Sequence, residues 1–178
     1  MPVVAGGESP VVRIVKVAWG DPRAVSLRQR MDTEMSEIYG SLFPSSGPDE
    51  VFAARRQALA IDPRDVRVTL LATDADGTPL AHAALRNLGG EWEVKRLFVD
   101  RPARGRGIGR RIMSDLEDVA RDAGAERLIL QTGDRQPEAV ALYERTGYQR
   151  IEIYEPYVTT FTFSLCFEKL LDHPDALL

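Results

Sequence analysis

The stretch EWEVKRLFVDRPARGRGIGR, residues 91–110, decides the fold of this chain. Its first part, residues 91–99, is rich in β-branched and aromatic side chains and predicts a strand. A helix follows the glycine- and arginine-rich part. The apolar positions of that helix recur at helical spacing and stop at Gly124: Ile108, Ile112, Leu116, Val119 and Ala123. Junctions between a strand and a helix are where phosphates bind in α/β folds.

The loop at this junction carries groups that suit an anion. Gly105, Gly107 and Gly109 let backbone N–H groups come close to a ligand, and the helix behind them adds its positive end. Arg104 and Arg106 would complete a nest for a pyrophosphate. The spacing is not Gly-x-Gly-x-x-Gly, because the third glycine comes one residue early, and Gly-Lys-Ser/Thr is absent. A flexible turn that happens to hold arginine is the alternative interpretation.

Strands are predicted on both sides of this stretch. Three of them would form an antiparallel meander: residues 66–73, 80–86 and 91–99. Residues 127–132 predict a buried strand, so that strand, loop, helix and strand form a βαβ unit. The predicted fold class is α/β with a mixed sheet.

The remaining elements lie at the two ends of the chain. A strand over residues 11–19 leads to a helix that Asp21 caps and Pro22 begins. The apolar stripe of this helix is Leu27, Met31, Met35, Ile38 and Leu42. Further helices are predicted over residues 50–59 and 137–145, and further strands over 148–154 and 158–168. In the last strand four side chains alternate onto one face: Phe161, Phe163, Leu165 and Phe167.

The composition predicts one domain, residues 11–178, after a loose tail over residues 1–10. Of the 178 residues, 44% are hydrophobic and 28% charged, and the net charge of −4 argues against a general nucleic-acid binder. With one cysteine, Cys166, and two histidines, His82 and His173, neither an internal disulfide nor a metal site is expected. The sequence has no signal peptide and no apolar run of about 18 residues, so we expect a cytoplasmic protein without a membrane segment.

Three segments carry a resemblance to a known family. The loop reads Arg104-x-x-Gly107-x-Gly109, residues 93–99 precede it, and residues 136–148 read QPEAVALYERTGY. In this order and spacing they resemble the GCN5-related N-acetyltransferase (GNAT) family: its pyrophosphate loop, the strand before it, and its Asn-x-x-Ala-x-x-Leu-Tyr-x-x-x-Gly-Phe/Tyr segment. The resemblance extends over residues 66–169.

The resemblance implies a mixed sheet that splays open between the strands 91–99 and 127–132. Acetyl-CoA, the co-substrate, would lie in that gap. The backbone of Leu97, Phe98 and Val99 would pair with its pantetheine arm. Its pyrophosphate would rest on the amides of the loop: Arg104, Gly105, Arg106, Gly107, Ile108, Gly109 and Arg110. Gln136 stands where the family usually has Asn, and a similar hydrogen bond to the cofactor is open to it.

Acetyl transfer to an amine needs two proton transfers, and the resemblance implies a residue for one of them. Tyr143 lies where the family has the acid that protonates the leaving thiolate, whereas its spacing alone would fit a core aromatic. Glu93 is the first choice for the base that deprotonates the amine, because strand alternation places it on one face with Lys95 and Leu97 near the gap. A solvated strand carboxylate is the alternative for Glu93.

Other polar residues are open to two interpretations. Asp32, Glu34 and Glu37 could bind a cationic amine or form the solvent-exposed face of the first helix. His82 fits a core histidine better than a catalytic one. Cys166 fits a small buried filler better than a nucleophile.

Together these features predict an enzyme that moves an acetyl group from acetyl-CoA to a primary amine by direct attack in a ternary complex. A non-catalytic CoA-binding regulatory or partner module is the alternative, and a nucleotide-binding module is a third possibility. The acceptor would contact residues 19–59 and 154–162, where no motif identifies it, and the net charge slightly favours a cationic one. The aromatic face over residues 161–167 could cover the core or meet a second subunit in a homodimer.

Overall fold

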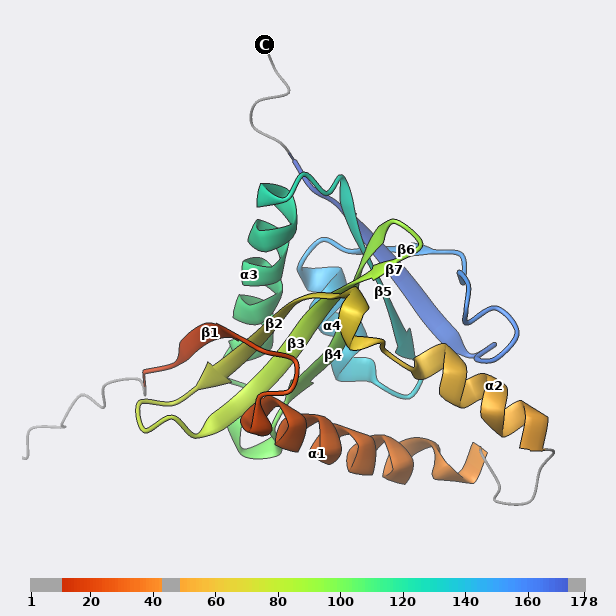
Figure 1. The fold of residues 1–178 in the computed structure, drawn as a ribbon, viewed down its shortest axis with the longest axis horizontal. Coiled ribbons are helices and arrows are strands. Elements are labelled where there is room, and N and C mark those ends of the chain that lie inside the picture. The colour runs from red at the N-terminus through yellow and green to blue at the C-terminus, as the bar shows by residue number, and fades with distance from the viewer. Residues whose placement is uncertain (1–10, 43–48, 173–178) are drawn as a thin grey trace, which may run out of the picture.

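The computed structural model describes residues 11–42 and 49–172, within which seven strands form one mixed sheet (Figure 1). The strands are β1 (Arg13–Val17), β2 (Val66–Thr73), β3 (Pro79–Leu88), β4 (Glu91–Val99), β5 (Arg127–Gly133), β6 (Gln149–Ile151) and β7 (Ser164–Leu170). Their order in the sheet is β1-β2-β3-β4-β5-β7-β6. All neighbours pair antiparallel except β4 and β5, which are parallel. The predicted meander is β2-β3-β4, and the predicted α/β fold with its mixed sheet is confirmed.

Helices cover both faces of this sheet. The α-helices in the described residues are α1 (Pro22–Tyr39), α2 (Asp49–Leu59), α3 (Ile108–Asp122) and α4 (Pro137–Arg145), and of these α1, α3 and α4 pack on the sheet. Leu70 of β2 belongs to the large core that α3 and α4 cover, whereas the next residue, Leu71, packs with Leu27 of α1. Because neighbouring strand residues point to opposite faces, α1 lies on the face opposite α3 and α4. No described helix is long and apolar enough to span a membrane.

The helix α1 begins as predicted but has two differing halves. Asp21 accepts a hydrogen bond from the Arg23 amide at 2.9 Å, and Pro22 is the first helical residue. Leu27 is fully buried, and Met31 packs against the same cluster. The later members of the predicted stripe, Met35 and Ile38, line a cleft instead of the core. The helix ends at Tyr39, and the last stripe residue, Leu42, lies in a short 3-10 turn.

The strands β4 and β5 separate soon after they meet. They pair over three residues each, 92–94 of β4 with 128–130 of β5. Beyond Val94 the strand β4 continues to Val99, and β5 continues to Gly133, with no pairing between them. The edges that face each other in this gap therefore keep backbone N–H and C=O groups that the sheet does not use. This is the predicted splay.

A bulge in β4 lies at the start of the splay. His82 of β3 is opposite Phe98, and Ala84 is opposite Lys95, so two β4 residues, Arg96 and Leu97, face one residue of β3. Arg96 takes up the extra length with a φ of 59°, in the left-handed region. The bulge shifts the alternation by one residue.

This shift corrects one prediction. Leu97 packs with Val94 in the core under α3, whereas Glu93 and Lys95 point to the other face, where both contact Tyr157. Leu97 therefore does not share a face with Glu93 and Lys95. Regular strand alternation could not reveal this, because the bulge inserts one residue between them.

Two strands near the C-terminal end are shorter than predicted. The strand expected over residues 148–154 is reduced to β6, and the one expected over 158–168 begins at Ser164. The segment before Ser164 turns on itself: the Phe161 amide donates to the Tyr157 carbonyl at 2.9 Å, and the Ser164 amide donates to the Phe161 carbonyl at 2.8 Å.

These turns remove part of the predicted aromatic face. Phe161 packs with Ala58 of α2 and with Tyr157, and does not lie on the sheet beside Phe167. The first strand is shorter than predicted as well, since Trp19 leaves it to stack under the Arg28 guanidinium, 3.7 Å from the ring centre. The predicted tail, residues 1–10, lies outside the described residues.

Candidate active site

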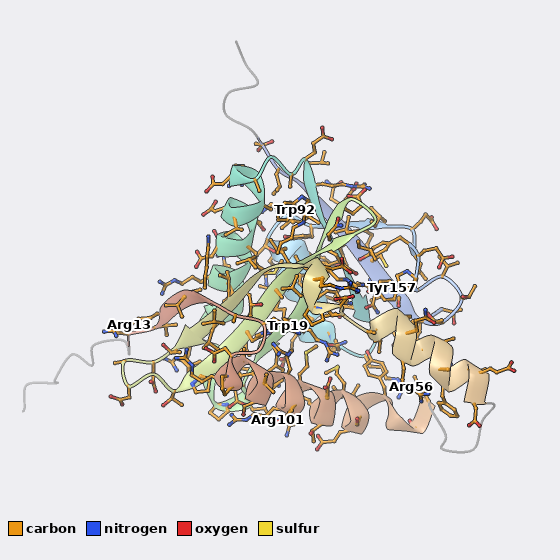
Figure 2. All side chains as sticks on the ribbon, in the orientation of Figure 1. Arg13, Trp19, Arg56, Trp92, Arg101 and Tyr157 are labelled. Carbon is orange, nitrogen blue, oxygen red and sulfur yellow. The ribbon has the colours of Figure 1, made fainter. Side chains whose placement is uncertain are left out.

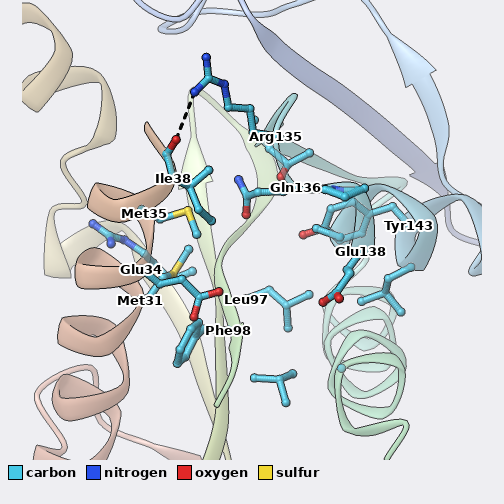
Figure 3. Close-up of a pocket in the computed structure, with 18 of the residues that line it drawn as sticks. Met31, Glu34, Met35, Ile38, Leu97, Phe98, Arg135, Gln136, Glu138 and Tyr143 are labelled. Atoms are coloured by element: carbon cyan, nitrogen blue, oxygen red, sulfur yellow. Dashed lines mark hydrogen bonds between the residues drawn. The ribbon is translucent and has the colours of Figure 1, made fainter. Parts of the chain in front are cut away.

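A cleft of about 1140 Å³ opens where β4 and β5 separate (Figure 3). On one side of it are α1 residues, among them Met31, Met35 and Ile38, and on the other are Glu138 and Tyr143 of α4. Most of the residues predicted for cofactor binding line this single space: Leu97, Phe98, Val99, Arg104, Gly105, Gly107, Ile108, Gly109, Arg110 and Gln136. Arg106 is exposed and is not among the lining residues.

The edge of β4 forms one long side of the cleft. Leu97, Phe98 and Val99 lie on the part of β4 that β5 does not pair with. An extended ligand can bind there as a further strand would, because the backbone offers alternating donors and acceptors. The predicted pantetheine site is therefore available in the geometry.

The glycine-rich loop ends the cleft at the N-terminus of α3. Gly105 and Gly107 have φ values of 74° and 73°, a conformation that favours glycine, and Gly107 is the residue that caps α3. A Cβ on Gly109 would lie 3.3 Å from the Leu142 side chain and 3.5 Å from that of Val99. Two glycines thus permit the turn, and the third permits close packing. The first amides of α3 have no carbonyl partner within the helix and suit an anion.

The Arg104 side chain binds protein groups in this structure. Its Nη2 donates to both carboxylate oxygens of Glu34, at 2.8 and 2.9 Å, and its Nε donates to the Val99 carbonyl at 3.0 Å. The guanidinium therefore ties the loop to α1 and to the end of β4. Its amide donates to the Arg101 carbonyl at 3.3 Å. A direct contact between the Arg104 side chain and a phosphate would compete with Glu34.

The Tyr143 hydroxyl faces the cleft from α4. The residue is 6% exposed, and its ring packs on Tyr148 and Phe167. Its hydroxyl has no hydrogen bond within the described part of the chain, which leaves the O–H free to donate to a ligand. Burial raises the pKa of the Tyr143 phenol well above its usual value, because the phenolate would be desolvated. The phenol therefore keeps its proton across the working pH range.

Glu93 lies beneath the cleft floor and not on its surface. It has no exposed surface, and one carboxylate oxygen accepts from the Arg86 Nε at 2.6 Å. The other oxygen accepts from two hydroxyls, Tyr154 at 2.9 Å and Tyr157 at 2.8 Å. The alternative that Glu93 is a solvated strand carboxylate is wrong, because the turns before β7 bring two tyrosines over it.

Lys95 connects this buried group to the cleft. Its Nζ donates to the Tyr157 hydroxyl at 2.7 Å and lies 3.8 Å from the Glu93 carboxylate, and the residue lines the cleft. Burial lowers the pKa of Lys95 to about 8, against the raising effect of Glu93. A chain of polar atoms thus runs from the cleft through Lys95 and Tyr157 to Glu93. Tyr157 packs with Ala58 near the C-terminal end of α2 (Figure 2).

His82 holds the bulge of β4 from the adjacent strand. The residue is fully buried, its Nδ1 lies 3.0 Å from the Arg96 carbonyl, and its Nε2 lies 3.0 Å from the Arg28 guanidinium. Since the guanidinium can only donate, Nε2 accepts and Nδ1–H donates to the bulge carbonyl. Burial lowers the pKa of His82 to about 4, so the ring is neutral at pH 7. The structure places His82 in the core, as the sequence favours.

The acidic residues of α1 pair with arginines across the cleft edge. Asp32 bonds to Arg96, while Glu34 bonds to Arg104 and Arg101. Glu37 also reaches Arg101, at 3.1 Å. These carboxylates are neither a free collecting site for a cationic amine nor only a solvated face.

Sequence reasoning missed the tyrosines over Glu93 and the role of Arg86. Tyr157 is 64 residues from Glu93 in an irregular segment, so no periodic pattern marks it. A signal for Arg86 was present: it stands opposite Glu93 across the β3–β4 hairpin, and opposite charges on facing positions attract. Cys166 is buried in β7, as expected for a filler.

Comparison with known proteins agrees with this geometry. The family model described as "Acetyltransferase (GNAT) family" matches residues 32–148, and the chain belongs to this family. The chain is 34% identical over 124 residues to the IAA acetyltransferase of Azospirillum brasilense, covering 70% of this chain and 78% of that protein. It is 30% identical over 142 residues to the N-alpha-acetyltransferase RimI of Mycobacterium tuberculosis, covering 77% and 85%.

A solved structure shares the architecture. The crystal structure of a Klebsiella pneumoniae protein assigned as an acyl-CoA N-acyltransferase superimposes with a TM-score of 0.70 and 26% identity, covering 90% of this chain and 98% of that one. The family match over residues 32–148 includes both the loop and the segment with Tyr143.

Proposed function

We propose that this chain transfers an acetyl group from acetyl-CoA to a primary amine. The observation that carries the proposal is one cleft in which an unpaired strand edge, a glycine-rich helix N-terminus and a free tyrosine hydroxyl meet. Family membership supports the class of reaction. The two relatives are named for different acetyl transfers, so they do not identify the acceptor.

In this proposal the cofactor lies between the unpaired edge of β4 and α4. The backbone of residues 97–99 holds the pantetheine arm, and the amides of residues 105–110 hold the pyrophosphate, since the Arg104 amide is bonded to the Arg101 carbonyl. Basic side chains at this end, Arg106 and Arg110, add charge at the mouth. Gln136, whose side chain caps no helix amide, extends its amide group toward the arm from the start of α4. Acetyl-CoA supplies the acyl group that is transferred.

Tyr143 is the proposed acid. The attack of the neutral amine forms a C–N bond and breaks a C–S bond, so the amine nitrogen loses one proton and the sulfur gains one. An amine that enters as an ammonium first loses a further proton to the base. The Tyr143 hydroxyl, which keeps its proton, donates to the departing sulfur and stabilises its negative charge. With one buried cysteine outside the lining of the cleft, direct attack by the amine is favoured over an acyl-enzyme.

Lys95 and Glu93 together are the proposed base. A protonated amine that enters the cleft meets Lys95 before Glu93, because only Lys95 lines the surface. Neutral Lys95 takes the proton, and Glu93 stabilises the resulting ammonium across 3.8 Å, with the Tyr157 hydroxyl bonded to both. Glu93 thereby acts through Lys95 and does not touch the acceptor.

The experiment that tests the proposed function follows release of the CoA thiol at saturating acetyl-CoA, with and without primary amines. Thiol release that depends on the amine, together with an acetylated product of the expected mass, supports it. Binding of acetyl-CoA without such release from any amine would favour the non-catalytic CoA-binding module. Preferential binding of ATP or NAD would favour the nucleotide-binding module.

A further inference from the structure

We propose, building on the proposed function, that the acceptor is a primary amine on an apolar body that carries no second positive charge. The part of the cleft that faces α1 is the space left over once the β4 edge, the loop and α4 are assigned to the cofactor. Its walls define what can bind there.

The first observation is the apolar character of this wall. Met31, Met35 and Ile38 follow one another at helical spacing along α1 and point into the cleft (Figure 3). Tyr39 stacks on Phe163, with ring centres 5.6 Å apart and planes 20° apart, and extends the wall. Phe163 in turn meets Phe161 edge to face at 5.8 Å. Such a surface gains most from an aliphatic or aromatic body.

The second observation is the charge of the lining. Six lining residues are basic and three are acidic. The basic ones are Lys95, Arg96, Arg104, Arg110, Arg135 and Arg145, and the acidic ones are Asp32, Glu34 and Glu138. Asp32 and Glu34 are bonded to arginines, and Glu138 belongs to α4 on the opposite wall. No carboxylate of the α1 wall, in the part of the chain that is described, remains for a second ammonium group.

The charge of the cleft differs from that of the whole molecule. The net charge of −4 would slightly favour a cationic acceptor, but the negative charge does not gather in the cleft. A second ammonium at the α1 wall would be taken out of water without a free carboxylate partner, which is costly. Polyamines and aminoglycosides are therefore poor acceptors in this account.

The test uses matched amines that differ in one feature. Hexylamine and 1,6-diaminohexane have the same chain, but the diamine adds a second positive charge. We expect kcat/KM to be at least tenfold higher for hexylamine. Ethylamine keeps the single charge and removes four methylenes, and kcat/KM should fall by about fourfold for each methylene that is buried. Equal or higher kcat/KM for the diamine or for ethylamine would overturn the inference.

A pair of variants ties the preference to the α1 wall. Met35→Glu adds an unpaired carboxylate to it, and Met35→Gln is the neutral control of similar size. We expect Met35→Glu to raise kcat/KM for the diamine relative to hexylamine by at least tenfold over the control. No change in this ratio, in variants that acetyl-CoA still stabilises against heat, would contradict the proposed wall.

The failures of the two proposals are distinguishable. A preference for diamines or polyamines with clear acetylation would overturn the acceptor class and leave acetyl transfer in place. Stabilisation by acetyl-CoA without acetylation of any amine would overturn the proposed function and the acceptor class with it.

Discussion

Among the described residues that line the cleft, Tyr143 and Lys95 are those whose pKa the protein shifts. Burial keeps the proton on Tyr143 and makes Lys95 easier to deprotonate. The two shifts suit the opposite roles that we propose, because Tyr143 would donate a proton and Lys95 would accept one. Each can be tested by changing one residue.

We expect Tyr143→Phe to lower kcat by about 10²-fold, because the variant keeps the ring and loses the donor to the sulfur. The ring contacts with Tyr148 and Phe167 remain, so the fold and the affinity for acetyl-CoA should hold. Steady-state kinetics at several pH values measure the effect. A kcat equal to that of the unchanged protein at all of them would remove Tyr143 from the mechanism.

The pH dependence of kcat/KM should report Lys95. Its pKa is lowered to about 8, so the neutral form that accepts a proton predominates above that pH. The rate should rise through pH 8, and this rise should be absent in both Lys95→Met and Lys95→Arg, since neither side chain titrates there. We choose Lys95 over Glu93, because removing Glu93 leaves Arg86 buried without its carboxylate, at a cost of about 3–5 kcal/mol. A rise near pH 8 that persists in both variants would exclude Lys95 as the base.

His82 predicts a pH dependence of stability. Its pKa is lowered to about 4 in the folded chain, against 6.5, so the unfolded chain binds a proton first as the pH falls. The free energy of unfolding should therefore be unaffected by this group above pH 6.5 and should fall by up to about 3 kcal/mol towards pH 4. Urea unfolding of the protein and of His82→Gln at a series of pH values isolates the contribution of His82 to the free energy of unfolding. Parallel pH curves would contradict a buried neutral His82.

Among the elements, the junction between β4 and α3 carries the most information. Its glycines and the capping residues of the adjacent elements are local features of the sequence. The strand, the loop and the helix could therefore be predicted. The bulge could not: Arg96 is not a glycine, and its left-handed φ depends on the β3 register and on the bond from His82. The predicted face of Leu97 was wrong for that reason.

Gly107 tests this junction. Its φ is 73°, and no atom lies within 4 Å of the position that an alanine methyl group would take, so Gly107→Ala adds backbone strain without a clash. We expect about 1–2 kcal/mol less free energy of unfolding and weaker binding of acetyl-CoA. Gly20→Ala is the matched control, since Gly20 is equally open and does not have a positive φ. A Gly107→Ala protein as stable as the control would contradict the strained cap.

For the whole molecule, the two sides of the cleft differed in how far the sequence could predict them. The proposed cofactor side is built from runs of consecutive residues on β4, α3 and α4, which carry the sequence motifs. The proposed acceptor side brings together α1, the end of α2 and the turns before β7, and the Tyr157–Glu93 bond spans 64 residues. Irregular turns have no periodicity, so the aromatic segment was predicted as a strand and its contacts were not foreseen.

The central claim is that the gap between β4 and β5 binds acetyl-CoA, and a thermal melt tests it most directly. The protein is heated with acetyl-CoA, CoA, ATP or NAD at matched concentrations. A ligand at about 100 times its Kd adds roughly 2.7 kcal/mol of stability, which should raise the midpoint by about 5–10 °C for a chain of this size. We predict that rise with acetyl-CoA and CoA and none with NAD. A cooperative melt that neither acetyl-CoA nor CoA shifts would contradict the account.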